Sequence, residues 1–107
     1  IITMPEIDVH YEILTPTAAE GTFKPRMTGM YVKLKPGQWI SEKEIRHHEV
    51  EESVLLLQGS MEAHLGGKVY ALGPGDSLFI PADVLHNFRN AGEDELAAVV
   101  YFSAYIL

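Results

Sequence analysis

The stretch Arg46–Gly59, RHHEVEESVLLLQG, places two histidines and three glutamates in front of a run of Val and Leu that ends at a glycine. Residues 53–58 are apolar on both faces of an extended chain, which is typical of a short strand buried on both sides. The polar half before them has no apolar stripe, so we expect a loop that runs into this strand. The sequence thus predicts a strand whose entry carries imidazole and carboxylate groups.

Short strand-like runs separated by Gly and Pro turns fill the rest of the chain. The predicted strands cover residues 8–14, 27–35, 60–65, 68–72, 77–80, 85–89 and 96–102. Gly66-Gly67 joins two of these runs and predicts a hairpin, because glycine accepts the positive φ that such turns need. Many short strands without a convincing long helix indicate an all-β sandwich or barrel of the jelly-roll type.

Composition limits the possible classes of protein. With 107 residues, 47% of them apolar, we expect one domain over residues 1–107. The net charge of -7 and the scattered Lys and Arg argue against direct contact with nucleic acid, and no run is long enough for a membrane span. Cysteine is absent, which favours the cytoplasm. The first residue is Ile1, as in a piece excised from a longer chain.

The histidines and glutamates of the opening stretch form a candidate metal site together with His86. Imidazole and carboxylate groups suit first-row divalent ions such as Mn, Fe, Co, Ni and Zn. The members would be Glu52, His86 and either His47 or His48. In an extended chain residues two apart share a face, so Arg46 and His48 point together and His47 points away.

The same alternation predicts what the following strand presents on each face. If Glu52 faces the interior, then Gln58 faces it as well. Leu55 and Leu57 would then form an outward apolar row. Such a row usually meets a covering strand or a second subunit, so we expect a homodimer.

The first stretch resembles the first motif of the cupin superfamily, G-x5-H-x-H-x(3,4)-E-x6-G. Glu52, six further residues and Gly59 match its second half. His48 matches the second histidine, and Arg46 stands where the first is expected. The spacer between Gly37 and Arg46 has eight residues, where the motif has five.

A second stretch resembles the second cupin motif, G-x5-P-x-G-x2-H-x3-N. Gly75, Pro81, His86 and Asn90 match it, and Asp83 stands where glycine is expected. Two motifs in order and at the right separation imply a cupin fold, an all-β double-stranded β-helix or jelly-roll barrel. The resemblance covers roughly the last two thirds of the chain.

The resemblance implies that His48, Glu52 and His86 bind a divalent transition metal (Fe, Mn, Ni, Zn or Co), with His47 as the alternative ligand. In that alternative, Ile45 takes the place of the first histidine and cannot ligate. Three ligands and water are sufficient for a catalytic-type site.

Arg46 bears on whether a metal binds, because a fixed cation repels a divalent ion. If Arg46 turns inward, it binds the carboxylate of a small acid, or it pairs with Glu52 and leaves no metal. The small-molecule pocket is expected to contain Arg46, Gln58, Phe88 and Asn90.

Three functions are compatible with these patterns, and no catalytic residue is assigned. Residues 11–16 (YEILTP), Lys35-Pro36-Gly37 and the spacing of His48 from Glu52 are similar to the C-terminal sensor half of helix-turn-helix transcription regulators. This narrower resemblance implies an effector-sensing domain. The alternatives are a stand-alone metal enzyme of the dioxygenase, isomerase, decarboxylase or lyase type acting on a small polar substrate, and a metal-free cupin that binds a sugar or an acid.

Overall fold

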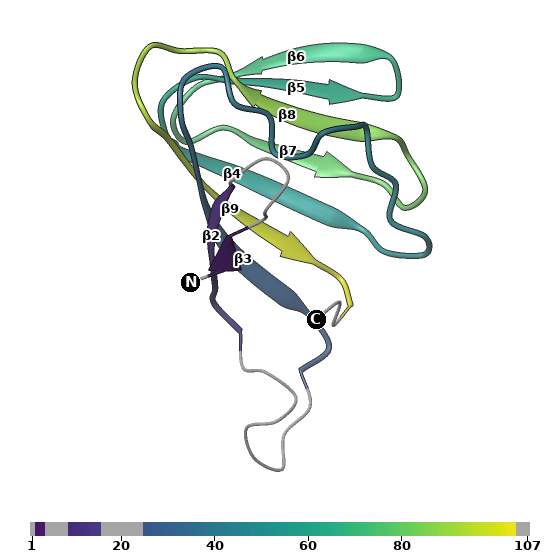
Figure 1. Ribbon diagram of the computed structural model, residues 1–107. Helices are drawn as coiled ribbons and strands as arrows, with labels where there is room; N and C mark the ends of the chain where they lie inside the picture. The colour runs from purple at the N-terminus through teal and green to yellow at the C-terminus, as the bar shows by residue number, and fades with distance from the viewer. Residues whose placement is uncertain (1, 4–8, 16–24, 105–107) are drawn as a thin grey trace.

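A computed structural model describes residues 2–3, 9–15 and 25–104 (Figure 1). The strands are β1 (Ile2–Thr3), β2 (His10–Ile13), β3 (Thr28–Leu34), β4 (Glu52–Gln58), β5 (Met61–Leu65), β6 (Lys68–Leu72), β7 (Ser77–Ile80), β8 (His86–Asn90) and β9 (Leu96–Phe102). Asp8 of one predicted strand and Pro16 of the 11–16 run lie outside the described residues. Among the described residues, no helix is long and apolar enough to cross a membrane.

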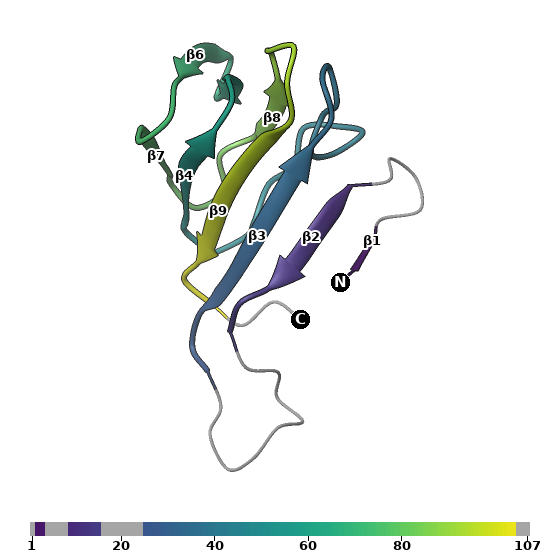
Figure 2. The ribbon, with the colours of Figure 1, turned by 90° about the vertical axis from the view of Figure 1, so that its left-hand side faces the viewer.

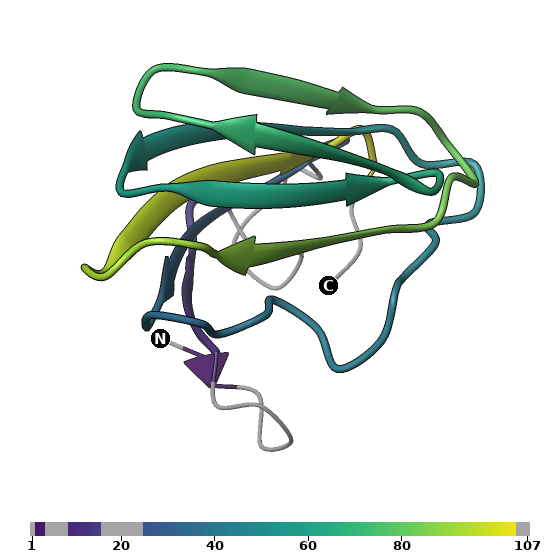
Figure 3. The same ribbon diagram turned by 90° about the horizontal axis from the view of Figure 1, so that it is seen from above.

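The strands form two antiparallel sheets that face each other. The larger has the order β1-β2-β3-β9-β4-β7, which Figure 2 shows side by side, and the smaller has the order β6-β5-β8. Seen from above, the smaller sheet covers one end of the larger (Figure 3). The predicted hairpin at Gly66-Gly67 is confirmed, because β5 pairs with β6 across it and both glycines have positive φ. The all-β prediction is therefore confirmed.

Strand β4 carries the centre of the core. Leu56 is fully buried between the sheets, whereas Leu55 and Leu57 are 38% and 47% exposed, as the alternation predicts. The prediction that Gln58 faces the interior is wrong. The pairing of β4 with β9 shifts between Leu56 and Gln58, and this irregularity leaves Gln58 exposed beside its exposed neighbour.

Residues 37–47, which we call the strap, run along the free edge of β8 (Figure 3). Backbone bridges join Trp39 to Arg89 and Ile45 to His86. Between these bridges the strap has five residues (40–44) where β8 has two (87–88), so the strap bulges outward. The buried Asn87 amide holds this bulge by donating to the Ser41 carbonyl at 2.9 Å.

Candidate metal centre

Two predicted ligands meet at the start of their strands. Glu52 is the first residue of β4 and His86 the first residue of β8, and they are 4% and 1% exposed. The His86 Nε2 atom lies 2.9 Å from Glu52 Oε1. The structure thus joins the two sequence motifs through one buried contact.

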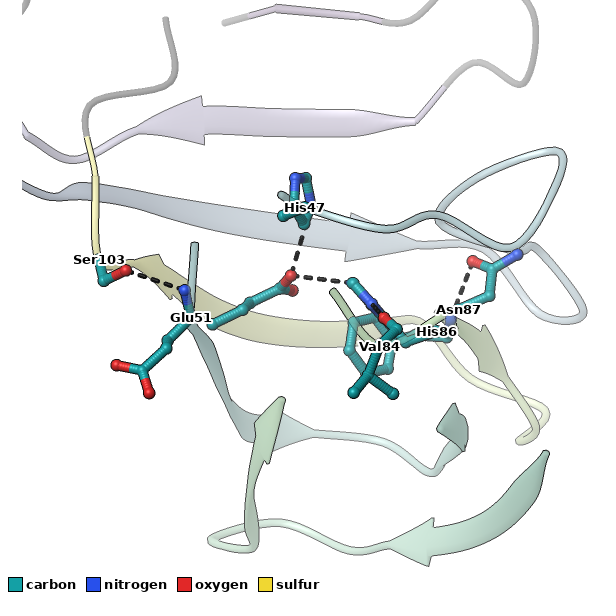
Figure 4. A network of polar contacts seen from close by, with 8 residues as sticks. His47, Glu51, Val84, His86, Asn87 and Ser103 are labelled. Carbon is teal, nitrogen blue, oxygen red and sulfur yellow. Dashed lines mark hydrogen bonds and ion pairs between the residues drawn. The ribbon is translucent and has the colours of Figure 1, made fainter. Parts of the chain in front are cut away.

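His47, at the end of the strap, supplies the third group of this cluster (Figure 4). Its Nε2 atom lies 3.5 Å from Glu52 Oε1, and its ring lies 5.5 Å from the His86 ring. The edge of the Phe102 ring packs against it with centroids 4.9 Å apart. The Nε2 atom is buried and has no hydrogen-bond partner.

His48, which the sequence places in the metal set, lies outside it. Its side chain is 83% exposed, and its Nδ1 atom contacts Asp83 Oδ1 at 2.7 Å. The alternation rule fails here because Glu49 has a φ of 58°, so residues 48–49 form a turn and β4 begins only at Glu52. His47, the alternative ligand with four residues before Glu52, takes the inward position.

Of the four residues expected in the small-molecule pocket, one lines the cavity. Phe88 lines the cavity at the site, but Arg46 and Gln58 are exposed. Arg46 therefore does not place a guanidinium in the interior. Asn90 is buried, yet its amide donates to the Leu34 and Asp94 carbonyls, so it holds backbone in place and does not face a ligand.

An apolar cavity of about 330 Å³ adjoins the cluster. His47 and Glu52 are part of its wall. Its other lining residues are Val9, Tyr11, Met30, Val32, Ile40, Ser41, Ile45, Phe88, Val100 and Phe102. The contribution of strands β2 and β3 was not predicted, although the alternation of Met30 and Val32 on one face was a signal for it. The volume is at the lower end of the range for small-molecule sites.

The hydrogen bonds of His86 define its protonation. Its Nδ1 atom lies 2.9 Å from the Val84 carbonyl, which can only accept, so Nδ1 carries a hydrogen. A proton or a cation between Nε2 and Glu52 Oε1 would complete their contact. Burial alone would lower the pKa of His86, but the hydrogen bonds to Glu52 and to the Val84 carbonyl outweigh it and raise the pKa.

The pKa of His47 moves the other way. Burial lowers it, the Glu52 carboxylate partly offsets this, and His86 lowers it further. A neutral imidazole can ligate a metal. One ligand atom each from His47, Glu52 and His86 lie within 4.8 Å of one another.

The donor set and geometry fit a divalent transition metal. Two imidazoles and one carboxylate are a common ligand set for zinc and for iron. Such an ion would satisfy the unpartnered His47 Nε2 atom and would take the place of the proton between His86 and Glu52.

A two-sheet antiparallel barrel with this inward cluster defines the cupin class. Residues 30–102 match the cupin domain family, and the chain belongs to this family. Similar solved structures include the TT1209 protein from Thermus thermophilus (TM-score 0.77, 22% identity, 97% of this chain and 90% of that one). A Cupin 2 conserved barrel domain protein from Salinispora arenicola has a TM-score of 0.74 at 18% identity, over 95% of this chain and 86% of that one. At these identities the likeness shows the fold.

Two curated relatives are similar in sequence. "Polyketide synthase CurC" of Streptomyces cyaneus is 37% identical over 70 residues, 65% of this chain and 44% of its own length. "Protein SchB" of Streptomyces halstedii is 38% identical over 89 residues, 83% of this chain and 61% of its own length. The chain thus spans less than two thirds of either relative.

Proposed function

We propose that this protein is a metal-dependent cupin that binds a small, mainly apolar molecule next to His47, Glu52 and His86. The buried, unpartnered Nε2 atom of His47 carries the proposal, because a polar atom without a partner costs free energy unless a ligand satisfies it. A bound ion would polarise an oxygen of the ligand as a Lewis acid.

The cavity wall supports an apolar ligand body. Its polar side chains are Tyr11, Ser41, His47 and Glu52, and the remaining lining residues are apolar. Among the described residues no Lys or Arg lines it, so a polar or anionic substrate would find little to bind apart from the metal. A carbon skeleton with a carbonyl or hydroxyl oxygen directed at the metal fits this wall better.

We propose a polyketide-derived molecule as the substrate. One relative is named a polyketide synthase, and polyketides are carbon chains that bear carbonyl and hydroxyl groups. Such a molecule combines the apolar body that the wall favours with an oxygen that a Lewis acid can polarise.

The experiment that tests the metal centre is elemental analysis of protein purified without chelators and without nickel resin. About one transition-metal ion per chain is expected, because the cluster offers one set of three ligands. Removal of the ion should abolish turnover or ligand binding, and reloading should restore it. Protein that takes up no metal even on reloading would overturn the proposal.

The effector-sensing role is the second proposal for the same cavity. A cavity of small-molecule size supports it, but neither curated relative is named a regulator. Binding of a small molecule without turnover, by a chain that carries a helix-turn-helix segment in its full-length form, would favour sensing. Chemical conversion of the bound molecule would favour the enzyme.

The homodimer remains a proposal that rests on the outer face of the larger sheet. Phe79 and Tyr101 are 54% and 41% exposed and flank Ser53 in the strand register, with Leu55 one row further along. This apolar group crosses three neighbouring strands, so a second copy could bury it. Sedimentation equilibrium should give twice the chain mass, and Phe79→Glu should give the monomer.

A further inference from the structure

The loop that points His47 inward is held from outside the cavity. His48 and Asp83 make a 2.7 Å side-chain contact at the surface, directly beside the inward imidazole. Asp83 also donates its backbone N–H to the His47 carbonyl at 3.0 Å. Asp83, in the loop that leads into β8, therefore contacts two successive residues, His47 and His48.

The backbone at these contacts adopts a conformation that is unfavourable for most residues. Glu49 and Asp83 have φ values of 58° and 66°, and they are the two described non-glycine residues in the left-handed region. The Asp83 carboxylate accepts from the backbone N–H of Glu49 as well as from His48. Asp tolerates this conformation better than most residues, and its carboxylate ties together the turn at 48–49.

The chain on the other side of His47 is also fixed. Ile45 and His86 exchange two backbone hydrogen bonds, of 2.8 and 2.9 Å. His47 thus lies between Ile45, which pairs with His86, and His48, which contacts Asp83. Asp83 and His86 belong to one segment, so these contacts set the position of the His47 imidazole relative to that of His86.

We propose that the His48–Asp83 contact positions His47 for metal binding. His48, which the cupin motif implies as a ligand, is then a positioning residue. This inference rests on the proposed metal centre. The contact is too exposed to contribute much to the stability of the barrel, because exposed ion pairs are screened by water. Its effect should therefore appear in metal affinity.

The test is a Co²⁺ titration of metal-free protein, followed by visible absorption. His48→Ala and Asp83→Gly should each weaken Co²⁺ binding about 10-fold, the lower end of the effect of residues that support ligands. The double variant should bind Co²⁺ no more weakly than Asp83→Gly alone, because Asp83→Gly already removes the contact with His48. His48→Asn, whose amide nitrogen can replace Nδ1 as the donor to Asp83, should restore affinity.

The control variant is His64→Ala, which removes another histidine–carboxylate contact, to Glu62 on the outer face of β5. It should bind Co²⁺ like the wild type. The thermal midpoint of the metal-free protein should be the same in wild type, His48→Ala and Asp83→Gly.

Four results would overturn the proposal. Unchanged Co²⁺ affinity in both single variants would show that the contact is a surface pair only. If the losses of Co²⁺ affinity added up in the double variant, the two side chains would act separately. A lowered thermal midpoint would show a general effect on stability. If wild-type protein gave no Co²⁺ spectrum, the metal centre itself would be wrong and the positioning role would fall with it.

Discussion

Two histidine–glutamate clusters lie on opposite faces of β8. Inside, Glu52 meets His86 and His47, and one imidazole nitrogen has no partner. Outside, both carboxylate oxygens of Glu62 are occupied, by His64 at 2.6 Å and by Arg89 at 2.9 Å.

The surroundings of the outer cluster complete the contrast. Trp39 packs against the His64 ring at 4.9 Å and lies under the Arg89 guanidinium at 5.8 Å. The Glu62, His64 and Arg89 side chains of the outer cluster are partly exposed, whereas Glu52 and His86 of the inner cluster are almost fully buried. Residue type alone therefore does not distinguish the two clusters, and the buried donor without a hydrogen-bond partner marks the inner one as the candidate metal site.

The largest effect should come from removing an inner ligand. His86→Ala should lose bound metal entirely, more than the roughly 10–100-fold that supporting residues cost. Elemental analysis of the purified variant measures this, and circular dichroism checks that the barrel remains folded. His64→Ala is the matched control and should keep the wild-type metal content. Equal metal content in His86→Ala and wild type would contradict the proposal that the inner cluster binds the metal.

The next effect concerns the inner wall. Phe88 is 1% exposed and packs 5.7 Å from the His86 ring, so Phe88→Ala should lower the free energy of unfolding by about 3–5 kcal/mol. Chemical denaturation of the metal-free protein measures the change. A loss below about 1 kcal/mol would mean that the inner wall is not packed as a core.

Arg89, the neighbour of Phe88 in β8 that faces outward, should contribute less to the free energy of unfolding. Arg89→Ala removes the ion pair with Glu62 and the contact with Trp39, and it should cost much less than Phe88→Ala because the pair is partly exposed and screened by water. Denaturation curves for Phe88→Ala and Arg89→Ala side by side give the comparison. Equal losses would contradict the assignment of the two faces.

The smallest effect is a pH dependence of the outer cluster. Hydrogen bonds from His64 and then from Arg89 lower the pKa of Glu62 below its ordinary value of 4.5. A lowered pKa in the fold stabilises the protein above 4.5, and this contribution disappears as pH falls through the folded pKa. The stability difference between wild type and Glu62→Gln should therefore shrink on acidification from about pH 6 to below 4.5, and a constant difference would refute it.

The sequence predicted strands β2 to β9 but not β1, and it named Glu52 and His86 directly and His47 as the alternative to His48. Alternation holds along β4, so the faces of Leu55, Leu56 and Leu57 were foreseeable. Glu52 and His86 came from motif spacing.

The rest depended on local backbone that composition does not reveal. His47 replaced His48 because Glu49, a residue with no preference for positive φ, adopts it in this turn. Gln58 turned outward at an irregularity in the β4–β9 pairing. Asn90 matched a motif position, but its amide nitrogen donates to the Leu34 and Asp94 carbonyls and its Oδ1 accepts from the Gly92 N–H, which only three-dimensional contacts show.

The bulge of the strap separates residues of the cavity wall from His47. Ile40 and Ser41 of the cavity wall lie within it, whereas His47 lies beyond the Ile45 bridge. Surface segments accept insertions and deletions more readily than paired strands. Length changes at residues 41–44 would therefore reshape the cavity wall while leaving His47 and His86, two members of the proposed metal centre, in register.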